Sequence, residues 1–158
     1  MKHPRPLTPS HPRVPARRAA VRRGAASAPA PPPAIAFVTL GCPKNTVDSE
    51  HMLGALVQDG FRTVGDPAAA DIAVINTCAF LQSAVRESKA AIAVLAELKQ
   101  RGTLKGLIVT GCLAQRAGGS LLEEFPEVDA VLGTGQWREV VGAARHLLAG
   151  RSERVVER

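Results

Sequence analysis

The sequence predicts a three-layer α/β domain in which helices cover both faces of a mostly parallel, five-stranded sheet. Three observations lead to this expectation. Short apolar runs rich in β-branched residues alternate along the chain with segments of helical periodicity. Strands that alternate with helices are joined by right-handed crossovers, which make the sheet parallel. The 158 residues also leave room for one domain with a substantial core and an additional N-terminal tail.

Apolar runs of strand length predict the five strands. We expect them at residues 35–40, 61–64, 72–75, 107–110 and 128–132. The third run is uninterrupted, which is typical of a strand buried on both faces of a parallel sheet. We therefore predict a fold of the flavodoxin-like type.

Helical spacing of apolar residues predicts the connecting helices. We expect them over residues 47–58, from Leu81 to Gly102, over residues 113–124 and from Trp137 to Gly150. The pair Gly118-Gly119 weakens the third of these helices, because glycine is a poor helix former. In the last helix Trp137 lies on the apolar stripe, and we expect it to belong to the core.

The N-terminal segment differs in composition from the remainder. Residues 1–33 contain nine of the twelve prolines and seven Lys or Arg, but no acidic residue, so they account for the net charge of +6. We expect this basic, Pro-rich extension to be disordered, with at most non-specific contacts to RNA. Residues 34–150 are expected to form the domain, and residues 151–158 the start of a linker.

Compartment and membrane association follow from cysteine usage and hydropathy. No apolar run is long enough to cross a bilayer, and no apolar signal-peptide segment follows the N-terminal charges. The chain contains three cysteines, an odd number that argues against a framework of disulfides. We therefore expect a reducing, cytoplasmic location without membrane partners.

The three cysteines carry the chemistry that the sequence suggests. Cys42, Cys78 and Cys112 follow the first, third and fourth expected strands within three residues. Because parallel strands end at one edge of the sheet, all three thiols should meet where open α/β sheets bind ligands. Each precedes an expected helix, whose N-terminus favours the metal-binding thiolate. Gly41 and Gly111 would let a bulky ligand approach the backbone.

Three interpretations of these cysteines are open. They could be buried structural residues, since free cysteine is often buried. They could bind zinc with His51 as the fourth ligand, although His51 lies well inside an expected helix. Thiolate ligands with an open fourth position fit an iron–sulfur cluster better than a closed zinc site. The side chains of Asn45, Asn76 and Thr77 would then donate hydrogen bonds to the cluster sulfurs.

Four segments around the cysteines resemble the motifs of the radical S-adenosylmethionine methylthiotransferases. They are residues 39–50, beginning TLGCPKN, residues 76–88, beginning NTCAF, residues 109–116, VTGCLAQR, and residues 128–135, VDAVLGTG. The resemblance is to the N-terminal domain of that family and covers about residues 35–140. The Pro43-Lys44-Asn45 step resembles the RimO-type members, which modify a ribosomal protein. The tRNA-modifying, MiaB-like members usually carry a different step at this point.

The resemblance implies a cofactor and a reaction. It implies that Cys42, Cys78 and Cys112 hold an auxiliary 4Fe–4S cluster in which one iron has no protein ligand. In the full-length enzymes a second 4Fe–4S cluster cleaves S-adenosylmethionine to a radical. The transferred methylthio group is then attached to an aspartate β-carbon of a small-subunit ribosomal protein of the decoding centre. That ribosomal protein would be the partner of this chain.

The radical chemistry needs further cysteines, and the sequence has none after Cys112. We therefore expect a truncated chain that binds the auxiliary cluster but is inactive alone. Two alternatives remain open at this point. The chain could be the corresponding domain of a MiaB-like tRNA-adenosine methylthiotransferase. It could also be a flavodoxin-like, non-catalytic binding module with structural cysteines.

Other polar residues near the cysteines have simpler explanations. The segment 133–135 (Gly-Thr-Gly) favours a tight strand-to-helix turn over a phosphate site, because the dinucleotide-binding fingerprint is incomplete. Asp48 and Glu50 fit helix initiation better than a catalytic carboxylate pair. Lys44 and Arg116 either neutralise an anionic cluster or bound sulfide, or are ordinary solvated residues.

Overall fold

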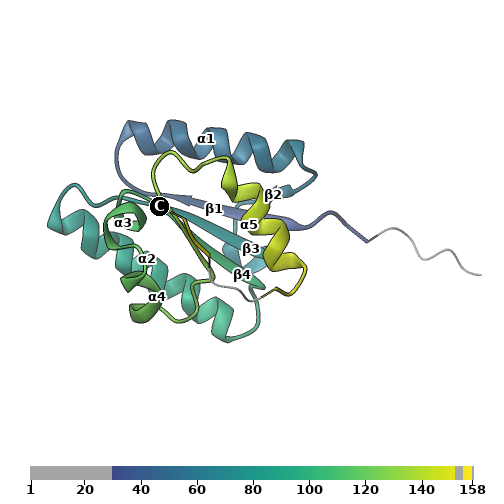
Figure 1. The fold of residues 1–158 in the computed structure, drawn as a ribbon. Coiled ribbons are helices and arrows are strands. Elements are labelled where there is room, and N and C mark those ends of the chain that lie inside the picture. The colour runs from purple at the N-terminus through teal and green to yellow at the C-terminus, as the bar shows by residue number, and fades with distance from the viewer. Residues whose placement is uncertain (1–29, 152–154, 158) are drawn as a thin grey trace, which may run out of the picture. The chain divides into compact units, whose positions relative to one another are not determined.

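The computed structural model describes residues 30–151 and 155–157. Its centre is a sheet with the strand order β2-β1-β3-β4-β5-β6 (Figure 1). The strands are β1 Ala34–Thr39, β2 Arg62–Val64, β3 Ile72–Thr77, β4 Gly106–Gly111, β5 Ala130–Leu132 and β6 Val155–Glu157. Every neighbouring pair is parallel. The predicted fold class is confirmed, and the order of the first five strands is the flavodoxin-like one.

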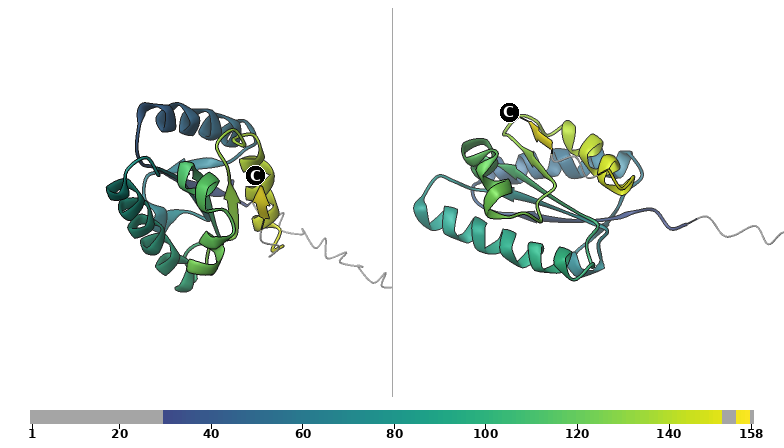
Figure 2. Two further views of the ribbon diagram at one scale, coloured as in Figure 1. Left: turned by 60° about the vertical axis from the view of Figure 1, so that its left-hand side comes forward. Right: turned by 60° about the horizontal axis from the view of Figure 1, so that its bottom comes forward.

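Helices cover both faces of this sheet. They are α1 Pro43–Gln58, α2 Gln82–Gln100, α3 Cys112–Ala117, α4 Ser120–Glu124 and α5 Glu139–Leu148, and a 3₁₀ turn, η1, spans Pro67–Ala69. Figures 1 and 2 show α1 and α5 over one face of the sheet and α2, α3 and α4 over the other. No helix in the described residues is both long and apolar enough to cross a membrane.

The central strands β3 and β4 are buried along their whole length. Their side chains alternate between two apolar clusters, as the pleat requires. Ile75 and Leu107 face α2, α3 and α4, whereas Val74 and Ile108 face α1 and α5. This two-sided burial explains the uninterrupted apolar run seen in the sequence.

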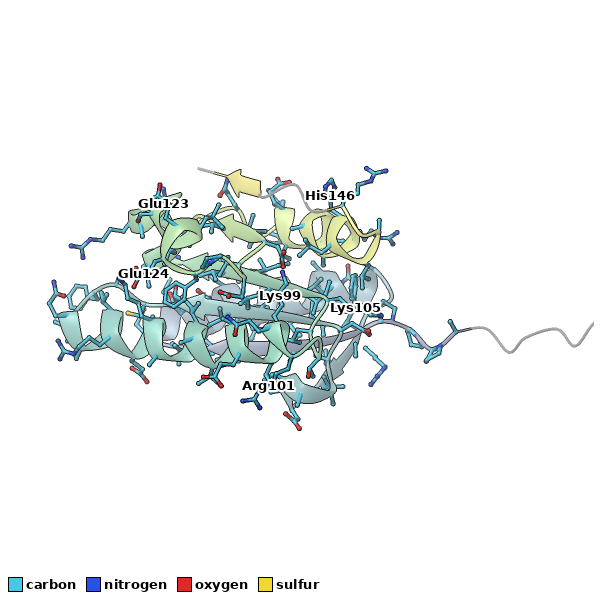
Figure 3. The ribbon with its side chains drawn as sticks, turned by 90° about the horizontal axis from the view of Figure 1, so that it is seen from below. Lys99, Arg101, Lys105, Glu123, Glu124 and His146 are labelled. Atoms are coloured by element: carbon cyan, nitrogen blue, oxygen red, sulfur yellow. The ribbon has the colours of Figure 1, made fainter. Side chains whose placement is uncertain are left out.

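Two aspartates fix the starts of the strands at the amino edge of the sheet. Asp71 accepts a hydrogen bond from the Ala34 amide at 2.8 Å and pairs with Lys105 at 2.8 Å. Asp129 accepts a hydrogen bond from the Leu107 amide at 2.8 Å and pairs with Lys99. Figure 3 shows Lys99, Arg101 and Lys105 together around the end of α2. At this edge the chain passes from α2 to β4 through an exposed turn at Gly102.

The structure differs from the expected element boundaries at the carboxyl edge. α1 begins at Pro43, not at residue 47, because proline with its fixed φ is well suited to the first helical position. The helix expected over residues 113–124 is divided into α3 and α4, because Gly118 adopts φ +51°. The third strand continues to Thr77. Cys42 and Cys112 therefore lie directly at helix starts rather than in loops.

Two further differences concern the C-terminal part. α5 begins at Glu139, so Trp137 lies before the helix and is only partly buried, with its ring stacked 5.4 Å from that of His51. β6 was not predicted, and it lies beyond residues 34–150 and pairs with β5. Of the extension expected to be disordered, residues 1–29 lie outside the described residues.

The buried face of β4 provides a test of the core. Ile108 is 0% exposed, so its replacement by Ala should reduce the free energy of unfolding by about 2–5 kcal/mol, from lost burial and the remaining cavity. Val94, which is 62% exposed on α2, is the matched control, and Val94→Ala should change stability by less than about 0.5 kcal/mol. Urea denaturation followed by circular dichroism measures both. Equal effects would contradict the described packing.

Candidate functional site

The three cysteines lie at the carboxyl edge of the sheet. Cys42 is the N-cap of α1 after β1, Cys78 follows β3 directly, and Cys112 follows β4 as the first residue of α3. All three line one open pocket of about 500 Å³, together with Gly41, Phe80, Leu81 and Ala84. In open α/β sheets this edge, next to the point where strand order reverses at β1, is where ligands bind.

The pocket does not have the geometry of a site for one metal ion. Within the described residues, no three His, Cys, Asp or Glu side chains are close enough to hold one. His51 is absent from the pocket lining and stacks instead on Trp137. The zinc site with His51 as fourth ligand therefore has no support in the geometry.

The three thiols differ in exposure and in acidity. Cys42 is exposed, Cys112 is half-buried and Cys78 is only 6% exposed. The backbone N–H groups of Asn45 and Lys44 face Cys42 at the start of α1 and lower the pKa of its thiol, without a capping hydrogen bond. Burial raises the pKa of the Cys112 thiol, and the nearby Cys78 and Cys42 raise it further.

The wall of the pocket between the cysteines is almost entirely apolar. Phe80 is 89% exposed and Leu81 59% exposed, and both contribute to the lining. Phe80 and Leu81 are adjacent in the chain and lie beside the cysteines, so they form one apolar patch rather than scattered exposed residues. The pocket thus combines three sulfur atoms with an apolar lining.

Two glycines allow the cysteine segments to pack against one another. Gly41 has φ +100°, and a Cβ atom there would lie 2.6 Å from the Cys78 Cβ. Gly111 has φ +95°, and a Cβ atom there would lie 2.2 Å from the Asn76 Oδ1. The sequence suggested that these glycines leave room for a ligand. In the structure the space is filled by the neighbouring segment of the protein itself.

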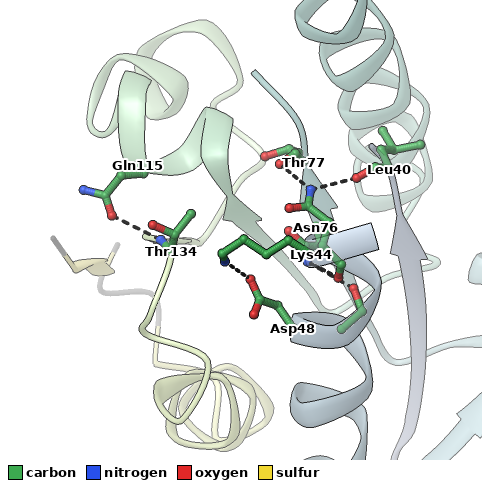
Figure 4. A network of polar contacts seen from close by, with 9 residues as sticks. Leu40, Lys44, Asp48, Asn76, Thr77, Gln115 and Thr134 are labelled. Carbon is green, nitrogen blue, oxygen red and sulfur yellow. Dashed lines mark hydrogen bonds and ion pairs between the residues drawn. The ribbon is translucent and has the colours of Figure 1, made fainter. Parts of the chain in front are cut away.

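A network of buried polar side chains joins the segments that carry the cysteines (Figure 4). Asn45 Nδ2 donates to the Leu40 carbonyl at 2.8 Å and to the Thr77 carbonyl at 3.0 Å. Asn76 Nδ2 donates to the Asn45 carbonyl at 2.9 Å. Thr77 Oγ1 donates to the Thr110 carbonyl at 2.6 Å, which links the segments that precede Cys78 and Cys112.

This network corrects the expectation that Asn45, Asn76 and Thr77 donate to cluster sulfurs. Asn76 Nδ2 donates a second hydrogen bond, to Ser49 Oγ at 3.0 Å, so both asparagine amides and the threonine hydroxyl donate within the protein. Their side-chain hydrogens are consequently not available to a ligand.

Two serines, which the sequence analysis included in the motif segments 39–50 and 76–88 without assigning them a role, contribute to the site. Ser49 Oγ accepts hydrogen bonds from Asn76 and from Thr39 Oγ1. Ser88 Oγ accepts from the Cys78 amide at 3.1 Å and donates to the Cys78 carbonyl at 3.0 Å. The available signal was the position of Ser88 on the apolar stripe of its helix. A hydroxyl at a core position needs buried partners.

The remaining candidates are arranged around the pocket. Lys44 pairs with Asp48 at 2.5 Å on the exposed side of α1. Because α1 begins at Pro43 and has no acidic residue in its first turn, the expectation that Asp48 and Glu50 help to start this helix is wrong. The charge of Lys44 also lowers the pKa of Cys42 and opposes the rise in the pKa of Cys112. Arg116 is exposed, and its Nη1 lies 3.4 Å from the Ala79 carbonyl.

The Gly-Thr-Gly segment after β5 forms a tight turn held by two glutamines. The Gly133 amide donates to Gln136 Oε1 at 2.6 Å, and the Thr134 amide donates to Gln115 Oε1 at 3.1 Å. These backbone donors are occupied by protein groups, as expected for a turn and not for a phosphate site. Through Gln115 the turn also supports α3, which begins at Cys112.

Comparison with known proteins identifies the family. The fold and the site define a parallel α/β domain with three free cysteines just beyond the ends of parallel strands. Residues 34–133 match the Uncharacterized protein family UPF0004. The chain belongs to this family, the N-terminal domain of the methylthiotransferases, and matches its RimO-type members.

Individual relatives agree with this assignment. The chain is 50% identical over 119 residues to ribosomal protein uS12 methylthiotransferase RimO of Desulforamulus reducens, covering 75% of this chain and 27% of that protein. For the protein of the same description from Anaeromyxobacter sp. strain K, the identity is 51% over 118 residues, 75% of this chain and 24% of that protein. The chain thus spans about a quarter of the length of these curated relatives.

The contact between Gly41 and Cys78 gives a test of the backbone at the site. Gly41→Ala should lower the free energy of unfolding by at least about 2 kcal/mol, because it combines an unfavourable φ with a clash against Cys78. Gly54, also exposed but inside α1 with nothing within 4 Å of an added Cβ, is the matched control. Gly54→Ala should stabilise the protein by about 0.5–1 kcal/mol. Urea denaturation compares the two variants.

The thiol acidities give a pH-dependent test on the reduced, metal-free protein. A lowered pKa means that the thiolate of Cys42 forms at lower pH, whereas the raised pKa of Cys112 delays its ionisation to higher pH. Alkylation by iodoacetamide between about pH 6 and 10, followed by mass spectrometry, should give a midpoint for Cys42 below the usual thiol value of about 8.5. The midpoint for Cys112 should be higher. The reverse order would contradict the described surroundings.

Proposed function

We propose that this chain is the cluster-binding domain of a methylthiotransferase, with Cys42, Cys78 and Cys112 as ligands of an auxiliary 4Fe–4S cluster. The observation that carries the proposal is that all three cysteines line one pocket at the carboxyl edge of the sheet. Family membership supports it independently. The relatives are named for ribosomal protein uS12, which favours a small-subunit ribosomal protein over tRNA as the substrate.

The donor set fits such a cluster in three respects. The ligands are all sulfur, which iron–sulfur clusters require. The pocket has a volume of about 500 Å³ and is lined by all three cysteines. The surrounding wall is apolar, which limits access of water to a bound cluster. Three protein ligands leave one iron free, and when bound the cluster would supply that iron as the attachment point for the sulfur to be transferred.

The surrounding protein would influence the ionisation of the cysteine ligands at this site. The start of α1 favours the Cys42 thiolate before any metal is present, because its backbone N–H groups face the sulfur. The half-buried Cys112 is harder to ionise beside the other two thiols, and a nearby positive charge opposes this effect. Lys44 supplies part of that positive charge. Binding of a cluster should therefore release protons and stabilise the domain.

The proposed reaction exceeds what this chain can do alone. In the enzyme that we propose, radical chemistry would be supplied by S-adenosylmethionine and a second 4Fe–4S cluster, and the methylthio group would be transferred to an aspartate β-carbon of the ribosomal protein. These functions fall to the part of the relatives that the chain does not match, since it spans about a quarter of their length. This domain would hold the sulfur and present it to the activated carbon.

Anaerobic reconstitution with iron and sulfide tests the proposal. The full chain should bind about four irons and turn brown, and Cys42→Ala, Cys78→Ala and Cys112→Ala should each lose the stable cluster. His51→Ala is the control, because His51 lies outside the pocket and its loss should leave the iron content unchanged.

Two results would overturn the assignment. If the wild type retained no iron while the cysteine variants remained folded, the cysteines would be structural residues. If the wild type bound one zinc ion whose retention depended on His51, the site would be a zinc centre.

A further inference from the structure

Asn45 lies between two of the cysteine segments and connects them. Its side chain is buried, with 1% of its surface exposed. One amide hydrogen bonds to the Leu40 carbonyl, two residues before Cys42, and the other bonds to the Thr77 carbonyl, immediately before Cys78. The NH₂ group of Asn45 thus connects the segment that leads to Cys42 with the segment that leads to Cys78.

The backbone of Asn45 is also tied to Cys42. Its amide donates to the Cys42 carbonyl at 2.9 Å in the first turn of α1. Its own carbonyl accepts from Asn76 Nδ2 at 2.9 Å, so the residue cannot turn without breaking a bond to β3. Asn45 is therefore fixed by the same two segments that it connects.

The packing at this point leaves little room for movement. An atom added at Gly41 would lie 2.6 Å from the Cys78 Cβ, 2.9 Å from its Sγ and 3.3 Å from Asn45 Nδ2. The Cys42 segment, the Cys78 side chain and the Asn45 amide thus meet at Gly41. A displacement of either segment would be transmitted directly to the other, because close-packed interiors transmit strain.

The two asparagines use their side-chain donors and acceptors differently. Asn45 Oδ1 and Asn76 Oδ1 are buried and have no hydrogen-bond partner in the part of the chain that the structure describes. An unpaired buried carbonyl destabilises the folded state, a cost that an apolar side chain would avoid. Both amide hydrogens of each residue, in contrast, are bonded. In both residues the donors are therefore fully used, whereas the acceptor is not.

We propose that Asn45 is a positioning residue that sets the separation of Cys42 and Cys78 for the cluster. This inference rests on the proposed function, because it assigns the purpose of the clamp to the ligand of that site. Asn45 donates to Leu40 and Thr77 and therefore acts through the cysteine segments rather than by contact with the ligand. Outer residues that orient metal ligands typically change metal affinity by about 10–100-fold when replaced.

The experiment compares Asn45→Ala and Asn45→Asp in the full chain. After anaerobic reconstitution, Asn45→Ala should lose iron to a chelator at least about 10-fold faster than the wild type, with altered EPR g-values of the reduced cluster. Asn45→Asp has nearly the same volume but would place a carboxylate against the Leu40 and Thr77 carbonyl oxygens, so its loss should be faster still. Thr39→Val is the control, because among the described residues the Thr39 hydroxyl donates to Ser49 at the edge of the network and not to a carbonyl beside a cysteine.

Hydrogen exchange on the metal-free protein separates the two proposals. Amides of residues 40–45 and 77–80 should exchange faster in Asn45→Ala than in the wild type, and not in Thr39→Val. If the wild type took up no iron, the cluster function would fail while faster exchange still established the clamp. If Asn45→Ala exchanged faster but held its cluster with unchanged EPR and chelation rate, the positioning role would be wrong.

A milder variant covers the possibility that Asn45→Ala does not fold. Asn45→Ser retains one hydroxyl donor and should release iron at a rate between those of the wild type and Asn45→Asp. Wild-type behaviour of a folded Asn45→Ser in both chelation and EPR would also overturn the proposal.

Discussion

The geometry of the site depends on the parallel register of β1, β3 and β4. In this register Thr39 lies beside Asn76, and Asn76 lies beside Thr110. The three strands therefore reach the same level, and the cysteines follow it by two or three residues. A slip of one residue in any pair would turn each side chain of that strand to the opposite face. Burial of β3 and β4 on both faces makes such a slip very unfavourable.

Above this level the chain changes from apolar to polar packing. Ile75 and Val109 contribute to the apolar core, whereas Asn76, Thr77 and Thr110 are equally buried but bonded to neighbouring segments. A helix or sheet ladder cannot satisfy the backbone groups where the strands end, so side chains take over this role. The price is the unpaired carbonyl oxygen on Asn45 and on Asn76. The apolar core thus stabilises the domain, whereas the polar contacts at the strand ends hold the cysteine segments in place.

The sequence predicted the layers and the position of the cysteines because both follow from periodicity. Apolar runs locate strands, and parallel topology then brings residues from distant strand ends to one edge. Helix boundaries were less predictable, since Pro43 reads as a loop residue unless its place at a helix start is known. The roles of Gly41 and Gly111 could not be deduced, because a residue pattern does not tell whether a ligand or the protein fills the space beside a glycine.

Only part of the polar network could be predicted from the sequence. The sequence suggests Asn45, Asn76 and Thr77 as donors near the cysteines. Their acceptors in the structure are backbone carbonyls and the Ser49 hydroxyl, and most of these lie far away in sequence. Such pairings depend on side-chain rotamers and on sub-ångström differences in strand twist. The strand β6 was missed because a short strand at the edge of a sheet has little periodicity of its own.

The turn at Gly102 is a suitable place to attach a probe or a fused protein. It is exposed, an added atom at Gly102 would meet nothing within 4 Å, and it precedes β4 at the edge opposite the cysteines. Insertions at such turns need only local adjustment of the chain. A fluorophore, a fused protein or a surface linkage attached there would leave the pocket facing the solution. The domain can therefore be labelled or immobilised at Gly102 while ligand binding is measured at the cysteine pocket on the opposite edge of the sheet.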